Sequence, residues 1–249
     1  MTWTLRCLCA GMLALTAAAV VAEEHAVDDD GERREQTGNE PAAKDVTEKL
    51  IVYIPPSRGS TRTRTGGGTR GQNNLPVIAA LAPDHVGLTT RASPTLGWFV
   101  SDAVSAPLEL TLLRDDATDP VLEVVVASEA KPGFGEVSLS QWDIALEQGV
   151  VYQWSVALPA DPDRRDLDVV ASGAIERVAE APELAAELGS GAPAHRVLAR
   201  HGIWYDALAE LGRGIASGDE GLRAERAALL EQVGLAEPAA SERARAHAR

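Results

Sequence analysis

The chain has 249 residues, of which 37 are acidic and 23 are basic, so its formal net charge is −14. This acidic balance argues for solubility and against nucleic acid or an anionic membrane as a partner of the molecule as a whole. The length is enough for one core of ordinary size with appendages.

The first 22 residues have the layout of a secretory signal peptide. The single basic residue Arg6 precedes an apolar run of about fifteen residues, and Val20-x-Ala22 satisfies the small-residue rule before a cut at Glu23. The run is too short to cross a ~30 Å hydrocarbon core comfortably, and no later stretch approaches ~20 apolar residues. We therefore expect residues 1–22 to be removed and the protein to be exported, periplasmic or secreted, without a membrane span.

Cleavage would also remove every cysteine of the chain. Cys7 and Cys9 are the only two, and both precede the predicted cut. The mature protein would then have no disulfide, no cysteine-ligated metal and no thiol nucleophile. Loss of Arg6 leaves 22 basic residues against 37 acidic ones, a net charge of −15.

Two segments of biased composition follow. Residues 23–50 hold ten acids and few large apolar side chains, which predicts a disordered acidic arm because little surface can be buried. Residues 51–74 are rich in Pro, Arg and Gly, and Ser57–Gly71 contains four arginines and no acid. For Ser57–Gly71 we favour a solvated linker. The alternative is a basic strip that binds anionic polymers, for which the candidate interaction residues are Arg62, Arg64 and Arg70.

From residue 75 to residue 178 the pattern changes to short apolar segments with turn signals about every eight to twelve residues. Leu108, Leu110 and Leu112 alternate with polar residues, as in a half-buried strand. The predicted fold class is mainly β, a sandwich or barrel. The predicted strands are Val77–Leu81, Gly87–Thr90, Thr95–Val100, Leu108–Leu113, Val121–Ala127, Glu136–Leu139, Val150–Leu158 and Leu167–Val178.

Three aromatic residues sharpen this prediction. Tyr152, six residues after Leu146, has the spacing of a tyrosine corner, in which the hydroxyl turns back onto the backbone upstream. Trp154 stands where antibody domains have a cysteine, so an indole would fill the core in place of a disulfide. Trp98 takes the place of the buried Trp of strand C. Together they predict an immunoglobulin-like or fibronectin-III-like sandwich, with Trp98, Tyr152 and Trp154 as structural residues.

After Val178 apolar residues recur at three- and four-residue steps, which is the period of helices. We predict a short helical hairpin over residues 182–236, with Gly234 at the end of its second helix, and a frayed tail over residues 237–249. Within the hairpin we expect Trp204 to face inward and Tyr205 to reach the rim. Both are candidate interaction residues.

Three patterns with possible chemistry have a simpler interpretation. His195 and His201 are six residues apart, so on one helix they point to different faces and do not share a metal. The loop over residues 161–168 has four aspartates, but two arginines neutralise it and it lacks the Gly and closing Glu of an EF-hand. Local Asp–Arg pairing is favoured there, with calcium as the alternative. Ser128-x-x-Lys131 ends a strand, so its likeness to penicillin-recognising enzymes is a chance match. We predict no catalytic residue, no cofactor and no metal site.

Several stretches taken together resemble a family of exported bacterial proteins, the domain-of-unknown-function family nine-two-eight. They are Gly66–Gly71, Gly87–Thr90, Ser93–Thr95, Tyr152-x-Trp154, Asp161–Arg164, Gly173–Val178, Gly202–Leu208 and Leu229–Leu235, which span residues 55–236 with their flanks. The resemblance implies that sandwich and helical tail form one unit, and it brings no reaction or ligand with it.

The resemblance also implies a spatial relation. Many members of the family carry one cysteine just after the Thr-Arg-Gly and another just before the Asp-Pro-Asp, where this chain has Gln72–Asn74 and Leu158–Ala160. If these cysteines pair in relatives, residues 70–74 of this chain should lie beside residues 158–161.

Three hypotheses on function stay open at this point. The favoured one is a non-enzymatic binding or structural module of the cell envelope, whose partner is an envelope protein or polymer. The second is an accessory protein that docks a partner through Trp204 and Tyr205. The third is a hydrolase whose site the sequence does not reveal; a deep pocket with converging carboxylates or histidines would favour it.

Overall fold

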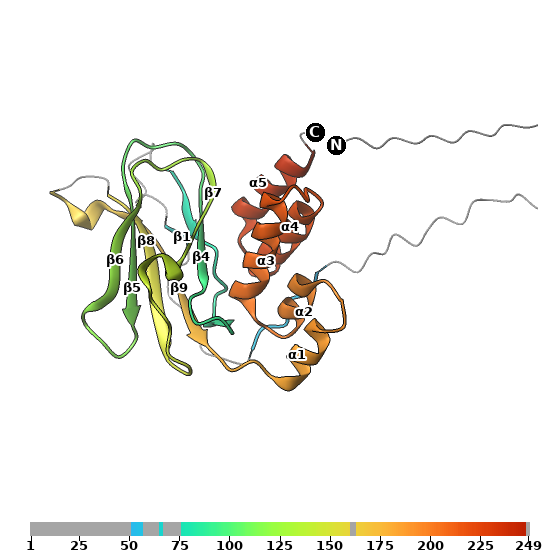
Figure 1. Ribbon diagram of the computed structural model, residues 1–249. Helices are drawn as coiled ribbons and strands as arrows, with labels where there is room; N and C mark the ends of the chain where they lie inside the picture. Colours follow the sequence, from blue (N-terminus) through green and yellow to red (C-terminus); the bar gives the residue numbers. More distant parts are fainter. Residues whose placement is uncertain (1–50, 57–64, 67–75, 160–162, 248–249) are drawn as a thin grey trace, which may run out of the picture. The chain divides into compact units, whose positions relative to one another are not determined.

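The computed structural model describes residues 51–56, 65–66, 76–159 and 163–247 (Figure 1). Four predictions lie outside these residues and stay predictions. They are the signal peptide, the disordered arm over residues 23–50, the candidate interaction residues Arg62, Arg64 and Arg70, and the proximity of residues 70–74 to residues 158–161.

The described residues form two open β-sheets, which confirms the predicted mainly β character. All eight predicted strands occur, with ends that differ by a few residues at most. The first sheet has the order β1–β2–β4–β7, in which β1 is Thr65–Gly66, β2 is Ile78–Ala80, β4 is Thr95–Val100 and β7 is Gly133–Ser138. The second has the order β3–β9–β8–β5–β6, which are Gly87–Thr89, Val169–Arg177, Val151–Leu158, Leu108–Arg114 and Pro120–Ala127. Pairing is antiparallel except between β3 and β9, which run parallel.

In the described part of the chain, five helices follow the sheets, in place of the predicted hairpin. They are α1 (Pro182–Leu188), α2 (Ala194–Arg200), α3 (Trp204–Ala216), α4 (Leu222–Gln232) and α5 (Ala236–His247). Glycines with positive φ stand between successive helices: Gly202 before α3, Gly218 before α4 and Gly234 before α5. This conformation costs glycine little, which explains why the chain turns at these points. Two short 3-10 turns, Leu139–Trp142 and Arg165–Leu167, complete the regular structure.

Helix α5 occupies the segment that the sequence predicted to fray. Its composition of Ala, Glu and Arg offers no apolar stripe, which is why the periodicity missed it. In the structure Glu242 is fully buried and pairs with Arg226 of α4, and Ala239 is also buried. A polar contact with α4 therefore holds this helix in place.

The residues at the start of the described chain are part of the same fold. Ile51 and Tyr53, which precede the segment predicted to be a linker, are buried. The Gln232 amide accepts a hydrogen bond from the Tyr53 N–H and donates one to the Ile51 carbonyl, both at 2.9 Å. The Ile54 N–H donates to the Ala199 carbonyl of α2. The described residues, sheets and helices included, form one compact unit, as the family resemblance implied.

Strand β4 lies in the middle of three layers, since it is buried at every position after Thr95. Residues on one face, Thr95 and Gly97, line a cavity with helix α3. Trp98, on the other face, lines a space with Leu108 of β5 in the second sheet. The four-stranded sheet is therefore covered by the other sheet on one side and by the helices on the other (Figure 1).

Trp98 is buried, as predicted, but on a different strand from the one expected. The prediction placed it on the neighbour of the tyrosine-corner strand β8. That neighbour is β5, and β4 belongs to the other sheet, between β2 and β7. Gly135 is paired with Trp98, and a Cβ atom at Gly135 would lie 2.5 Å from the indole Cε2. The glycine thus makes the space that the indole occupies.

Tyr152 has the geometry predicted for a tyrosine corner. It is buried at the start of β8, and its hydroxyl accepts a hydrogen bond from the backbone N–H of Glu147 at 3.3 Å. We expect Tyr152→Phe to lower the free energy of unfolding by about 1 kcal/mol, because the ring stays and one hydrogen bond is lost. Urea unfolding measures this change. A variant as stable as the parent would show that the contact contributes nothing.

Among the described helices, none is long and apolar enough to cross a membrane.

Candidate functional site

Trp204 is an anchor between the helices and the first sheet. It is fully buried, as predicted, and its Nε1–H donates a 2.9 Å hydrogen bond to the Leu81 carbonyl. Its indole meets the ring of Tyr53 edge to face, with the centroids 5.0 Å apart. The indole is therefore a structural group and is closed to a partner protein.

Tyr205 was predicted at the rim, and this prediction was wrong. Only 1% of it is exposed, because its side chain lies against strands β3, β8 and β9 of the five-stranded sheet. Its hydroxyl donates to the Ala174 carbonyl and accepts from Trp154 Nε1–H, each at 2.9 Å. Burial raises the pKa of this hydroxyl. A Cβ atom at Gly87 would lie 2.7 Å from the Tyr205 ring, so glycine is needed there for the ring to fit.

These positions remove the basis of the docking hypothesis. Trp204 and Tyr205 offer no exposed aromatic surface on the tail. Asp206, next in the chain, is likewise buried, and it accepts hydrogen bonds from the Thr89 hydroxyl and from the Thr90 N–H and hydroxyl. All three residues fasten α3 to the sheets.

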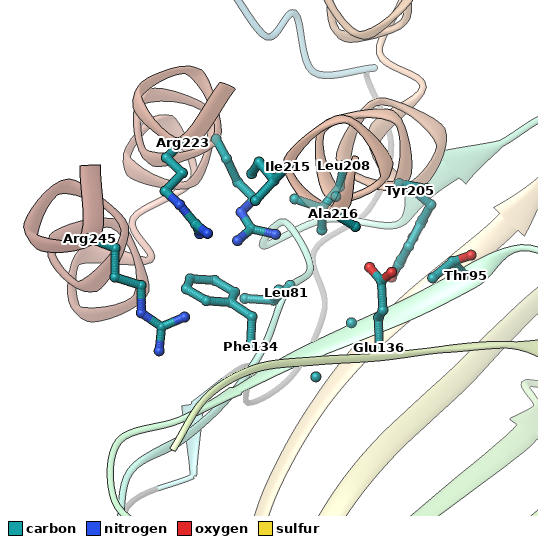
Figure 2. Close-up of a pocket in the computed structure, with 15 residues that line it drawn as sticks. Leu81, Thr95, Phe134, Glu136, Tyr205, Leu208, Ile215, Ala216, Arg223 and Arg245 are labelled. Atoms are coloured by element: carbon teal, nitrogen blue, oxygen red, sulfur yellow. The ribbon is translucent and has the colours of Figure 1, made fainter. Parts of the chain in front are cut away.

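A cavity of about 280 Å³ lies between the four-stranded sheet and helices α3, α4 and α5 (Figure 2). We call it the seam cavity. Its wall combines apolar side chains, two aromatic rings, a carboxylate and three guanidinium groups. The residues that matter below are Leu81, Phe134, Glu136, Leu208, Gly212, Ile215, Arg223, Arg226 and Arg245.

Phe134 of β7 separates two of the arginines. The guanidinium carbon of Arg226 lies 4.3 Å from the ring centroid, and that of Arg245 lies 5.6 Å from it. Both distances are within the range of cation–π attraction. Phe99 packs on the ring from the neighbouring strand, with the centroids 5.3 Å apart, and this contact fixes the ring.

Arg226 carries a buried donor without a partner. The residue is 7% exposed, and its Nη2 donates to Glu242. Its Nε–H has no hydrogen-bond partner among the described residues. Burial lowers the pKa of the guanidinium, and the charge of Glu242 opposes this effect. A buried donor left unpaired costs about 1–3 kcal/mol.

Arg245 is the arginine whose charge is most available. It makes no hydrogen bond or ion pair with the described residues, whereas the other arginines of the helices are paired with glutamates. Those paired arginines are Arg196, Arg200, Arg213, Arg223, Arg226 and Arg243. Among the described residues of the helices, Arg245 is therefore the arginine without an ion pair, and it lies at the seam cavity.

Glu136 of β7 is a carboxylate of the same cavity that, like Arg245, has no ion pair with the described residues. It makes no hydrogen bond with them either, although it lies across the cavity from the arginines (Figure 2). A Cβ atom at Gly212 of α3 would lie 2.9 Å from its Oε2. The carboxylate thus sits directly against the backbone of α3, where glycine leaves room for it.

A second polar cluster joins the described N-terminal segment to the β2–β3 loop. The Tyr53 hydroxyl lies 2.7 Å from His85 Nε2, and His85 Nδ1 lies 3.2 Å from an oxygen of Asp84. The order Asp–His–hydroxyl is that of a nucleophile activated by a base. However, burial, with a smaller contribution from Asp84, raises the pKa of Tyr53, which disfavours its anion. The cluster holds residues 51–56 against the core.

The remaining predicted residues have structural contacts. His195 of α2 pairs with Glu225 of α4, and His201, the C-cap of α2, pairs with Glu187 of α1. In the loop before β9, Arg164 pairs with Asp166 and Arg165 with Asp168, which is the Asp–Arg pairing favoured from the sequence. Among the described residues no group of three or more His, Cys, Asp or Glu side chains could hold a metal ion.

Ser128 and Lys131 both line an open cavity of about 390 Å³ between the sheets. They lie in the connection between β6 and β7, away from any helix start, so the structure gives them no likeness to penicillin-recognising enzymes.

One feature of the sequence pointed to the seam cavity, and the sequence predictions did not include it. Arg226 falls in the apolar stripe of α4, four residues after Leu222 and three before Leu229. A charged residue in such a stripe is buried with a partner or points into a site. Arg245 and Glu136 carried no such signal, because their roles depend on contacts between distant segments.

A match to one protein family covers most of the chain. The family described as Domain of Unknown Function (DUF928) matches residues 65–243. The chain belongs to this family. The DUF928 match includes both sheets and every residue of the seam cavity named above except Arg245, which lies just beyond it.

Other comparisons add little to the DUF928 assignment. One similar solved structure is that of astrotactin-2, described as a conserved vertebrate-specific and perforin-like membrane protein involved in neuronal development. It has 10% sequence identity and a TM-score of 0.26, and the match covers 70% of this chain and 36% of that one. No curated protein matches the chain.

Proposed function

We propose that the chain is an exported, non-enzymatic binding protein of the cell envelope, and that it binds a small charged ligand in the seam cavity. The observation that carries this proposal is the unpaired Nε–H of Arg226, a buried donor in the wall of a cavity. Native structures leave few such groups unsatisfied, and a bound ligand is one way to satisfy them. The unpaired charges of Arg245 and Glu136 at the same cavity support it.

Ligand binding can be tested by thermal unfolding in the presence of small metabolites. The compounds are grouped by charge into carboxylates, phosphates, amines, amino acids and neutral sugars. A ligand at about 100 times its Kd stabilises the folded state by ~2.7 kcal/mol, which raises the Tm by several degrees. We expect compounds of at least one class to raise the Tm. Arg245→Gln should abolish the shift, and Arg243→Gln, on the same helix but paired with Glu231, should keep it.

Two results would contradict the proposal. One is that no compound of the screen raises the Tm. The other is a shift that Arg245→Gln leaves unchanged, since the ligand would then bind elsewhere.

Export is the second part of the proposal, and it is supported by the basic, apolar and small-residue order of the first 22 residues. We expect the protein recovered from the envelope to begin at or near Glu23. Intact mass or N-terminal sequencing measures this. Recovery of the full 249-residue chain would contradict it.

We further propose that the two sheets are those of an immunoglobulin-like or fibronectin-III-like sandwich. In such sandwiches strands G, F and C are neighbours in one sheet, and A, B and E share the other. The orders β9–β8–β5 and β2–β4–β7 follow this scheme, and Tyr152 begins β8, the equivalent of strand F. On this assignment Trp98 is on strand B.

A further inference from the structure

The open cavity of about 390 Å³ between the two sheets has a buried floor and an exposed rim. We call it the inter-sheet cavity. Its floor includes Trp98 and Leu108, which are only 6% and 1% exposed. Its rim includes Glu129, Lys131 and Pro132, which are exposed. A molecule that enters past the rim therefore meets the inner faces of both sheets.

Trp98 presents a hydrogen-bond donor to this cavity. Its Nε1–H makes no hydrogen bond with the described residues, whereas the indole N–H groups of Trp154 and Trp204 both donate to protein oxygens. Three side-chain atoms of the described chain are enclosed without a partner, and Trp98 Nε1 is not one of them, so this N–H keeps accessible surface. A Cβ atom at Gly135, which also lines the inter-sheet cavity, would lie 2.6 Å from Trp98 Nε1. The donor therefore faces this cavity.

The rest of the wall is mainly apolar. Besides Trp98 and Leu108 it includes Ala127, Pro132 and Phe134. Small-molecule sites typically have volumes of ~300–1,000 Å³, apolar and aromatic walls, and a few polar groups that orient the ligand. The inter-sheet cavity is near the lower end of this range, which favours a molecule of about one ring. An aromatic ring suits a wall that contains an indole and a phenyl group, because aromatic pairs attract beyond the area that they bury.

The charges at the rim favour a neutral ligand. Lys131 and Glu129 form no ion pair with the described residues, and both line the cavity. A charged ligand would be attracted by one of them and repelled by the other. It would also lose hydration against the apolar wall, which is costly for a charge. Since an indole N–H can only donate, the ligand must supply an acceptor.

We propose that the inter-sheet cavity binds a neutral aromatic molecule of about one ring that carries an acceptor oxygen. Trp98 Nε1–H donates to this oxygen, and the ring packs against Leu108 and Phe134. The site is distinct from the seam cavity, with which it shares only Phe134 and Gly135 among the described residues. The proposal goes beyond the proposed function and does not rest on it.

Two probes of nearly the same shape test the proposal. Acetophenone has a carbonyl oxygen where α-methylstyrene has a CH₂ group. We expect acetophenone to bind at least about threefold more tightly, as one neutral hydrogen bond allows. Because α-methylstyrene is the more apolar of the two, burial alone would give the opposite order. Ligand-detected nuclear magnetic resonance titrations give both dissociation constants.

The variants separate the donor from the cavity. Trp98→Phe removes the N–H and keeps a ring, so it should bind the two probes equally. Ala127→Leu adds bulk to the wall and should weaken both probes at least about tenfold. Ala157→Leu makes the same change on the outer face of the same sheet and should bind both like the parent. Arg245→Gln, which alters the seam cavity, should also bind acetophenone like the parent.

Three results would overturn the proposal. One is that the parent binds α-methylstyrene as tightly as acetophenone, or binds neither. Another is that Ala127→Leu binds acetophenone like the parent. The third is that benzoate binds more tightly than acetophenone and is weakened by Lys131→Gln, since the site would then select an anion. If Trp98→Phe does not fold, which its circular dichroism shows, the two probes and Ala127→Leu decide the matter. Any of these results leaves the ligand of the seam cavity to its own test.

Discussion

Trp204→Ala is expected to lower the free energy of unfolding by about 3–5 kcal/mol, the range for truncation of a large buried aromatic residue. The indole is fully buried, contacts the Tyr53 ring and donates to the Leu81 carbonyl, so its loss leaves both a void and an unpaired acceptor. Equilibrium urea unfolding gives the change.

Two further variants show which part of the indole matters. Trp204→Phe keeps much of the volume but removes the hydrogen bond, and it should cost about 1–3 kcal/mol, less than the alanine variant. Trp142 is half-buried, so Trp142→Ala should cost clearly less than Trp204→Ala. A Trp204→Ala protein as stable as the parent would mean that the helices are not fastened to the sheet through this residue.

Glu242→Ala is the second variant for which we expect a large loss, again about 3–5 kcal/mol. Glu242 is fully buried in α5 and pairs with Arg226 and Arg223 of α4. Its removal leaves the buried Arg226 guanidinium without a counter-charge, and α5 loses the contact that holds it. Loss of helical signal in the far-ultraviolet circular dichroism should accompany the loss of stability.

A double variant and a surface control complete this test. Arg226→Met with Glu242→Leu removes both charges and should recover most of the stability, because an apolar pair of similar size suits a buried site. Glu231→Gln breaks the exposed pair with Arg243 on the same two helices and should cost at most ~1 kcal/mol. If Glu242→Ala behaved like Glu231→Gln, α5 would not depend on the buried pair.

The strands could be predicted from the sequence because each is a local pattern. Alternation at Leu108, Leu110 and Leu112 is visible within one strand, and the spacing from Leu146 to Tyr152 lies within one turn and one strand. The pairing of strands was harder. Trp98 was expected beside β8, and local patterns carry no information on which sheet a strand joins.

The misassigned positions all depend on contacts between distant segments. Tyr205 lies against β3, β8 and β9, so its place on a helical wheel predicted a rim that does not exist. Helix α5 has no apolar stripe, and its buried Glu242 pairs with Arg226 and Arg223 of α4. The seam cavity joins a strand and three helices, and of its charges only Arg226 left a trace in the local pattern.

The hydrogen bond between Tyr53 and Gln232 joins residues 179 positions apart in the chain. Contacts of such long sequence separation form late, because a long loop must close first, and they slow folding. The core around Tyr53 and Trp204 therefore cannot be completed until α4 has been synthesised. For the export that we propose, this late closure has a use, because a chain that has not completed its core is what a translocation channel can thread.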